Sequence, residues 1–331
     1  MLKKQKRGIK LKKITSIILV IALVFLLESC KDENNGEVKS VEFSVIAPVG
    51  SPALAQTFME STLPSLGDNV TYDIEIVSGV DPLIVAFGSE SHEIIYAPTN
   101  LGAKLISTGV PYKFAGTVVW GNLYLATGTD EEFTMADLDG KDIVVFGQNA
   151  TPDIILQTIL DAYTWVVEPT ITYVADAGTA MGEVVLDPSK IVLLAEPVLS
   201  VASLPSKVGN MKSIDLQAEW AKITGDNSYP QAGIFVHEDL DKDVVEAYLL
   251  AVQNSINEAL TNTAAVAQMA VDLEYGTFPL PVLLGAIPRS NLEFMSALDS
   301  RTDLETYFGY IIAINPALIG GALPEDSFYF E

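Results

Sequence analysis

From Val41 onward, short runs rich in β-branched residues alternate with segments of helical period, and this alternation constrains the fold most strongly. Strands that alternate with helices predict an α/β architecture with mixed, mainly parallel sheets. The chain has 331 residues, of which 49% are hydrophobic, so it is long enough for two lobes with buried cores. The predicted strands are Val41–Ala47, Thr71–Val77, Glu93–Tyr96, Phe114–Val119, Asp142–Phe146, Ile171–Val174, Ile191–Ala195 and Gly233–Val236.

The C-terminal third has a different pattern, with apolar residues at the i, i+3 and i+4 spacings of amphipathic helices. We expect helices at Asp241–Asn262, Ala264–Leu273 and Asn291–Phe308. This part therefore adds a C-terminal helical segment to the predicted fold.

The first thirty residues have the features of an export signal. Met1–Lys13 is strongly basic, and the apolar stretch Ile14–Leu27 is shorter than the ~20 residues of a membrane-spanning helix. Leu27-Glu-Ser-Cys30 resembles a bacterial lipoprotein signal, from which Glu28 departs. The resemblance implies a signal peptide over 1–29, lipidation of Cys30 (diacylglyceryl, with palmitate as acyl chain), and anchoring to the outer face of the cytoplasmic membrane. The alternative is an uncleaved short anchor with an incidental cysteine.

Charge and residue usage exclude several classes of protein. After residue 29 the chain has 12 basic and 42 acidic residues, a net charge of −30, and such a surface repels nucleic acids. Cys30 is the only cysteine and His92 and His237 the only histidines, so we expect no disulfide, no metal site and no cofactor. We interpret both histidines as structural or surface residues. The sequence contains no P-loop, no GxGxxG fingerprint and no GxSxG nucleophile elbow.

Polar residues follow the predicted strands where helices are expected to begin. Ligands of open α/β sheets bind at the carboxyl ends of strands, where helix N-termini direct backbone N–H groups into the crevice. Ser51 and Pro52 follow the first strand, and Tyr96, Thr99 and Asn100 follow the third. Ser51 and Thr99 are each either a helix cap or a ligand contact, whereas Tyr96 and Asn100 offer a ring and an amide.

Two further strands end in the same way. Thr151 and Pro152 begin a helix after Asp142–Phe146, where Thr151 and nearby N–H groups could form a nest for an anion or a carbonyl. Glu196 follows Ile191–Ala195 and is either a solvated carboxylate at a helix start or a polar contact in the crevice.

Two segments have the character of crossings between lobes. Trp120 and Gly121 interrupt the apolar run over 114–127, and Trp120 is either core or a stacking surface. Tyr229 and Gln231 precede the strand at Gly233–Val236 and mark the return. The only arginines after residue 29 are Arg289 and Arg301, whose roles the sequence leaves open. This scarcity favours a neutral, cationic or weakly anionic ligand.

Taken in order, these segments resemble the type II substrate-binding proteins of ABC importers, in the branch of sulfonate, taurine, nitrate and thiamine-pyrimidine receptors. The matching segments are Ile94–Leu105, Val119–Leu125, Asp137–Lys141, Val144–Asp153 and Leu194–Val198. The family implies two α/β lobes that close on a ligand, joined by crossings near Leu123–Thr127 and Gln231–Val236. After a flexible tether over 30–40, lobe 1 would combine 41–122 with 237–331, and lobe 2 would be 123–236.

The resemblance also implies where the ligand binds. Carried over by position, the contacts are Ser51, Pro52, Thr99, Asn100, Trp120, Gly121, Thr151, Pro152 and Glu196, with weaker matches at Tyr229 and Gln231. The aromatic residues near the proposed crevice favour a flat ring over a bare inorganic anion: Tyr96, Trp120, Tyr124 and Tyr229. The alternative is that all four belong to the core.

We therefore expect a monomeric, lipid-anchored, extracytoplasmic subunit that captures a small organic solute and delivers it to an ABC permease and its ATPase. In this hypothesis the chain is not an enzyme and binds no nucleic acid. Two alternatives remain open: an enzyme with the same fold, similar to menaquinone-pathway enzymes or a pyrimidine synthase, and a sensor subunit that signals to a membrane partner. Product formation abolished by changing His92 or Asp153 would favour the enzyme.

Overall fold

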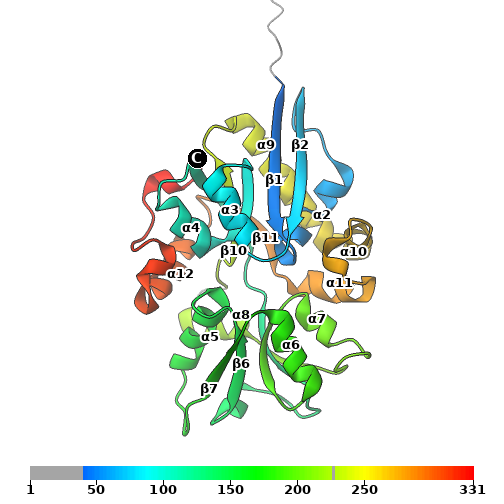
Figure 1. The fold of residues 1–331 in the computed structure, drawn as a ribbon, viewed down its shortest axis with the longest axis vertical. Coiled ribbons are helices and arrows are strands. Elements are labelled where there is room, and N and C mark those ends of the chain that lie inside the picture. Colours follow the sequence, from blue (N-terminus) through cyan, green and yellow to red (C-terminus); the bar gives the residue numbers. More distant parts are fainter. Residues whose placement is uncertain (1–39, 226–227) are drawn as a thin grey trace, which may run out of the picture. The chain divides into compact units, whose positions relative to one another are not determined.

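The computed structural model describes residues 40–225 and 228–331. The chain divides after Ser40, and Val41–Glu331 form one compact unit. The predicted signal peptide, the lipidation site Cys30 and nearly all of the tether lie outside the described residues. The fold class is confirmed, because Val41–Glu331 contain two mixed β-sheets, each flanked by helices (Figure 1).

The first sheet has six strands in the order β11-β4-β10-β3-β1-β2. Their bounds are β1 (Val41–Pro48), β2 (Val70–Val77), β3 (Ile94–Pro98), β4 (Tyr112–Val119), β10 (Ala232–His237) and β11 (Leu292–Ser296). β1 pairs in parallel with β2 and β3, whereas β10 is antiparallel to β3 and β4, and β11 is antiparallel to β4.

Side-chain alternation along β1 explains how the first sheet is covered on both faces. Phe43, Val45 and Ala47 are buried with apolar residues of α2, α9, α10 and α11, whereas Ile46 is buried on the other face with residues of α3, α4 and α12. The helices are α2 (Ser51–Thr62), α3 (Asp81–Ser89), α4 (Thr99–Ile106), α9 (Lys242–Thr261), α10 (Thr263–Asp272), α11 (Leu280–Ala286) and α12 (Arg301–Ile314).

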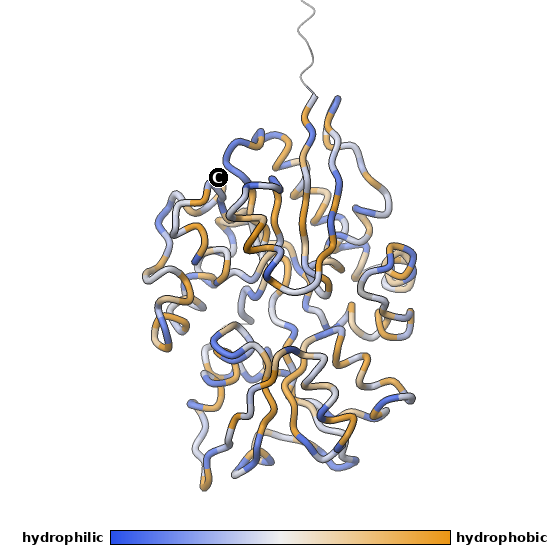
Figure 2. The backbone as a smooth tube through the Cα atoms, viewed as in Figure 1, coloured by the Kyte–Doolittle hydropathy of each residue, from blue (hydrophilic) through white to orange (hydrophobic). Residues whose placement is uncertain are grey.

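The second sheet has five strands in the order β7-β6-β8-β5-β9. Its elements are β5 (Leu123–Thr127), β6 (Asp142–Phe146), α5 (Thr151–Asp161), β7 (Thr170–Val174), α6 (Ala177–Leu186), β8 (Ile191–Ala195), α7 (Val198–Ala202), β9 (Lys212–Asp215) and α8 (Leu216–Thr224). β6 is parallel to β7 and β8, and β5 is antiparallel to β8 and β9. Parallel pairing is thus less extensive than the sequence predicted. Figure 2 shows hydrophobic residues along the strands of both sheets.

Short 3-10 helices complete the described secondary structure at η1 (Met135–Leu138), η2 (Tyr275–Thr277), η3 (Ile287–Arg289), η4 (Pro316–Ile319) and η5 (Asp326–Phe328). Among the described helices, none combines the length and the apolar character that spanning a bilayer requires.

The prediction of one helix over Asn291–Phe308 is wrong in its first part. Leu292–Ser296 form strand β11 at the edge of the first sheet, and α12 begins at Arg301. In β11, Leu292 is buried and Glu293 is exposed, so the short segment fits a sheet edge as well as a helix turn, and its pairing with β4 decides between the two.

The two proposed crossing segments both contain strands. Leu123–Thr127 is strand β5 of the second sheet. The crossing proposed over Gln231–Val236 overlaps β10 (Ala232–His237), which pairs with β3 and β4 in the first sheet. The boundaries of the two lobes remain a proposal.

Candidate functional site

The helices that follow β1, β3, β6 and β8 begin close to a set of buried polar residues. α2 follows β1, α4 follows β3, α5 follows β6 and α7 follows β8. Hydrogen bonds join residues at these helix starts across the two sheets, as the next paragraphs describe. We call this region the interlobe site. Buried polar groups need hydrogen-bond partners, so their concentration here indicates that these side chains are arranged to pair with one another.

Asn122, which lies between β4 and β5, is the centre of the first group of contacts. Its Nδ2 donates to Ser51 Oγ at 2.8 Å and to the Glu196 carbonyl at 3.2 Å. Its backbone N–H donates to Gln231 Oε1 at 3.1 Å, and Gln231 Nε2 donates back to Asn122 Oδ1 at 2.7 Å. Ser51 Oγ in turn donates to Ser290 Oγ at 2.9 Å. We call these five residues the Asn122 cluster. Through it, residues that adjoin both sheets are hydrogen-bonded to the Asn122 side chain.

Glu196 of this cluster also forms an ion pair with Arg289. Arg289 Nε lies 2.7 Å from Glu196 Oε1, although their alignment is not that of a hydrogen bond. The Glu196 side chain is fully buried, while that of Arg289 is 40% exposed. Ser200 links the two, because its N–H donates to Glu196 Oε2 at 3.2 Å and its Oγ accepts from Arg289 Nη2 at 2.8 Å.

Burial has a larger effect on the pKa of Glu196 than its charged partner has. Loss of solvation raises this pKa above its ordinary value, and Arg289 and the hydrogen bonds from Ser200 offset only part of the rise. A buried carboxyl with a raised pKa next to a cation is typical of functional sites.

A second group of contacts joins the starts of α4 and α5, and we call it the Thr151 cluster. Thr151 Oγ1 donates to Asn100 Oδ1 at 3.2 Å and accepts from the Tyr307 hydroxyl at 3.1 Å. All three residues are buried. Two predicted site residues that are 51 positions apart in the sequence therefore meet. The positive ends of two helix dipoles lie at this point, which favours an anionic or carbonyl group.

Ser51 and Thr99 do not cap their helices, contrary to one of the two predicted roles. Gly50 and Pro98 occupy the N-cap positions, and neither makes a side-chain cap. Ser51 takes part in the Asn122 cluster instead, and Thr99 Oγ1 donates to the Pro230 carbonyl at 2.6 Å. Pro52 and Pro152 lie within the first turns of α2 and α5, where a missing N–H is tolerated.

Of the predicted aromatic contacts, Tyr96 and Tyr229 lie in the cores of the two sheets. The Tyr96 hydroxyl lies 3.0 Å from that of Tyr248 on α9, and the Tyr229 hydroxyl donates to Gln217 Oε1 at 2.7 Å. Both tyrosines are fully buried and their hydroxyls pair within the protein, so their role as ligand contacts stays a prediction.

Trp120 lies at the junction of the two sheets. Its Nε1 donates to the Glu293 carbonyl on β11 at 3.1 Å. It lines a cavity of about 450 Å³, and Asp215 of β9, Gln217 of α8 and Leu292 of β11 line the same space. The size is that of a small-molecule pocket. Gly121, the next residue, has φ +82°, which only glycine adopts readily.

Neither histidine lies at the interlobe site. His92 and His237 lie near the start of β3, whereas Asn100 follows its end, so the length of the strand, ~16 Å at ~3.3 Å per residue, separates them from the site. Asp153 is also engaged elsewhere, because its carboxylate accepts from Tyr173, Gln157 and the Asn149 N–H. Within residues 40–225 and 228–331 no cluster of His, Cys, Asp and Glu suits a metal ion.

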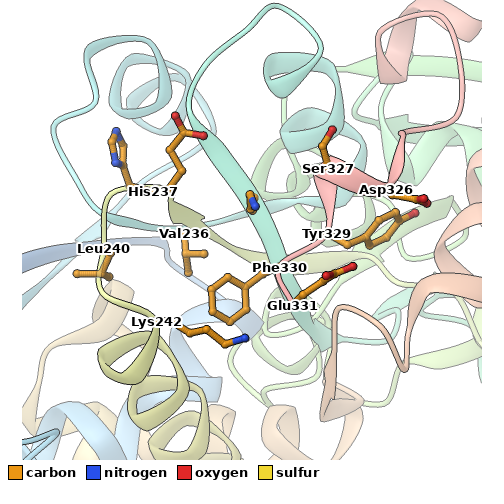
Figure 3. A pocket seen from close by; sticks show the side chains of 11 residues that line it. Val236, His237, Leu240, Lys242, Asp326, Ser327, Tyr329, Phe330 and Glu331 are labelled. Carbon is orange, nitrogen blue, oxygen red and sulfur yellow. The ribbon is translucent and has the colours of Figure 1, made fainter.

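A separate cavity of about 350 Å³ lies between β10, the start of α9 and the C-terminal residues (Figure 3). It contains no predicted site residue. Lys113 and Lys242 are balanced there by Glu238, Asp326 and Glu331, and Phe330 projects into the space beside Lys242. We assign no function to it.

Sequence reasoning did not place four residues of the interlobe site: Asn122, Arg289, Ser290 and Tyr307. Asn122 stands directly after the Trp120-Gly121 motif, which was a usable signal, and Arg289 stood out by its rarity. Ser290 and Tyr307 have no local signal, because only the fold brings the C-terminal third to the helix starts.

Solved structures with a similar fold include binding proteins of transport systems. An ABC transporter protein from Parabacteroides distasonis matches with a TM-score of 0.77 and 23% identity, over 88% of this chain and 99% of that one. The aliphatic sulphonate-binding protein SsuA from Escherichia coli matches with a TM-score of 0.62 and 11% identity, over 85% and 86%. The alkanesulfonate-binding SsuA from Xanthomonas axonopodis pv. citri, bound to MOPS, matches with a TM-score of 0.58 and 12% identity, over 87% and 96%.

At these identities the likeness is one of fold. No curated protein matches the sequence. A family model described as menaquinone biosynthesis matches residues 123–307, more than half of the chain, including the second sheet, β10 and the Arg289 and Tyr307 positions. The chain therefore belongs to the menaquinone biosynthesis family.

Proposed function

We propose that the chain is the solute-binding subunit of an ABC importer and that it encloses a small organic solute at the interlobe site. The observation that carries the proposal is the pairing of polar side chains from both sheets at the starts of α2, α4 and α5. The fold shared with SsuA proteins supports it, since those proteins bind sulfonates.

The contacts of the interlobe site indicate how a solute would be held. In the structure, Asn100 pairs with Thr151, and Glu196 pairs with Arg289. A solute that enters between the lobes would replace these direct contacts, taking hydrogen bonds from the helix starts and charge from the ion pair. A taurine-like zwitterion fits both charges, and a sulfonate or a pyrimidine like a thiamine precursor would use the hydroxyl and amide groups.

We further propose that the binding protein acts outside the cytoplasmic membrane as a monomer, held there by a lipid on Cys30, and passes its solute to a permease with an ATPase subunit. The Leu27–Cys30 segment supports this assignment. In this proposal the chain binds and releases its solute without chemical change.

The test begins with mass spectrometry of the gently purified and then denatured protein, which identifies a co-purified solute. The wild-type affinity for that solute, or for taurine if none is retained, is then compared with that of Asn100→Ala by calorimetry. We expect about tenfold weaker binding, ~1.4 kcal/mol, because the variant loses the amide at the start of α4. Gln268→Ala, on the exposed side of α10, is the control. Equal affinities in the three proteins would contradict the proposed site.

The lipid anchor has its own test. Cys30→Ala is expected to move the protein from the membrane fraction to the soluble fraction and to abolish its labelling with palmitate, while solute affinity stays unchanged. Retention in the membrane fraction would mean that Ile14–Leu27 remains as an uncleaved anchor.

An enzyme is the second candidate function, and the match to the menaquinone biosynthesis family favours it. The interlobe site contains one suitable acid or base, Glu196, whose pKa burial raises. Conversion of a co-purified or candidate substrate to product, lost in Glu196→Gln, would replace the receptor proposal with this one. Stoichiometric binding without turnover would exclude it.

A further inference from the structure

The second sheet has a pocket lined by aromatic rings that is separate from the interlobe site. It lies between the end of α5, the segment over 162–169 and the start of β7, and its volume is about 410 Å³. α5 begins at Thr151 in the interlobe site and ends at Asp161 in this pocket, so the helix, ~16 Å at ~1.5 Å per residue, separates the two. The lining is Gln157, Leu160, Asp161, Tyr163, Trp165, Glu168, Pro169, Ile171 and Tyr173. We call it the aromatic pocket.

The polar atoms of its three aromatic side chains already have partners, so the parts left to a ligand are the ring surfaces that the Tyr163–Trp165 stack does not cover. Tyr163 and Trp165 stack with ring centroids 5.6 Å apart, and Trp165 Nε1 donates to the Leu160 carbonyl at 3.0 Å. The Tyr163 hydroxyl donates to Glu219 Oε2 at 2.5 Å. The Tyr173 hydroxyl donates to Asp153 Oδ1 at 2.7 Å.

The carboxylates of Glu219 and Asp153 change the acidity of the Tyr163 and Tyr173 hydroxyls. Desolvation and the adjacent carboxylates raise the pKa of Tyr163 and of Tyr173 to about 12, so both phenols stay neutral at physiological pH. A hydroxyl that donates to an anion leaves its ring richer in electrons, which strengthens the attraction of the ring face for a cation.

All the charged side chains that line the aromatic pocket are acidic. Asp161 and Glu168 are exposed at its edge, and the lining residues include no lysine, arginine or histidine. Neither carboxylate has an ion-pair partner in the described part of the chain. Two free carboxylates beside three rings match an ammonium group with an apolar surface, since the rings attract its methyl groups and the carboxylates its charge.

We propose that the aromatic pocket binds the ammonium head group of a small organic cation. The site acts independently of the interlobe site, because no residue of the Asn122 or Thr151 cluster lines it. Tyr163, Trp165 and Tyr173 hold the alkyl groups of the cation, and Asp161 and Glu168 balance its charge.

The test uses choline and its uncharged isostere 3,3-dimethylbutan-1-ol, titrated into the purified protein by calorimetry. We expect saturable binding of choline and at least tenfold weaker binding of the alcohol. Trp165→Leu should abolish choline binding, and Glu168→Gln should weaken it at least threefold, whereas Glu42→Gln on β1 should leave it unchanged. Because Glu168 is exposed, its variant tests the site even if Trp165→Leu does not fold.

Two results would overturn the proposal. Equal affinity for choline and for the alcohol would show that charge has no part in the binding. Choline binding that survives Glu168→Gln and is lost in Asn100→Ala would assign choline to the interlobe site. Failure of the interlobe proposal, in contrast, would leave choline binding and its loss in Glu168→Gln unaffected, so the two proposals fail separately.

Discussion

Gly121→Ala is expected to lower the free energy of unfolding by about 2–4 kcal/mol and to weaken solute binding at least tenfold. At φ +82° an added Cβ would lie 2.6 Å from Gln217 Cγ and 2.8 Å from Tyr229 Cζ. Gln217 Oε1 accepts from both the Leu123 N–H and the Tyr229 hydroxyl, so its displacement disturbs the link between the two sheets. Urea unfolding and calorimetry measure the two effects.

Gly225→Ala separates backbone strain from the clash. Gly225 has the same φ of +82°, but no atom of residues 40–225 and 228–331 would lie within 4 Å of an added Cβ there. This control should lose only ~1 kcal/mol, the usual strain of a left-handed residue with a side chain. Equal losses in the two variants would show that the contacts with Gln217 and Tyr229 do not hold the crossing in place.

Arg289→Met is expected to lower the free energy of unfolding by about 2–3 kcal/mol near pH 7. The change leaves the Glu196 carboxylate buried without its cation. This loss is at or below the low end of the range for breaking a buried ion pair, because the Arg289 side chain is 40% exposed. The double variant Glu196→Gln with Arg289→Met should recover most of the loss, since no buried charge remains.

The pH dependence gives a second readout of the same pair. Burial raises the pKa of Glu196 above its ordinary value of 4.5, so the folded protein binds this proton more readily than the unfolded chain. Its contribution to stability is therefore greatest below pH 4.5 and falls as the pH rises through the raised pKa. Without Arg289 the pKa rises further, and the fall extends to higher pH.

Urea unfolding between pH 4.5 and pH 8 checks this dependence. The slope of the free energy of unfolding against pH should be steeper in Arg289→Met than in the wild type, and it should flatten in the double variant. A slope that is equally steep with and without the Glu196 carboxyl would assign the dependence to another group.

The sequence predicted those parts of the fold in which local pattern and tertiary structure agree. β6 and β8 have the predicted bounds, and α9 differs from its prediction by one residue at each end. β9 and β11 were missed because each is short and forms the edge of its sheet, so pairing with a neighbour, not local propensity, makes it a strand.

The sequence identified residues of the candidate site only where a residue directly follows the end of a predicted strand. Asn100 and Thr151 could be named from the helices that they begin, but their meeting depends on how two sheets pack. Ser51 was expected to serve as a cap or a ligand contact, yet its hydroxyl is taken up by Asn122 and Ser290, residues 71 and 239 positions away. No short stretch of the sequence contains both partners of such a contact, so a local pattern cannot predict it.

The order of strands in the two sheets has a consequence for how the protein is made. Every strand of the second sheet comes from one continuous segment, Leu123–Asp215, so that sheet can assemble once this segment has left the ribosome. In the first sheet, β10 lies between β3 and β4. These two strands can pair with β10 only after more than a hundred further residues have been synthesised. Until β10 is made, β3 and β4 thus each have an unpaired edge, and unpaired strand edges favour association with other chains. The interlobe site is complete only after α12, which carries Tyr307, has been synthesised.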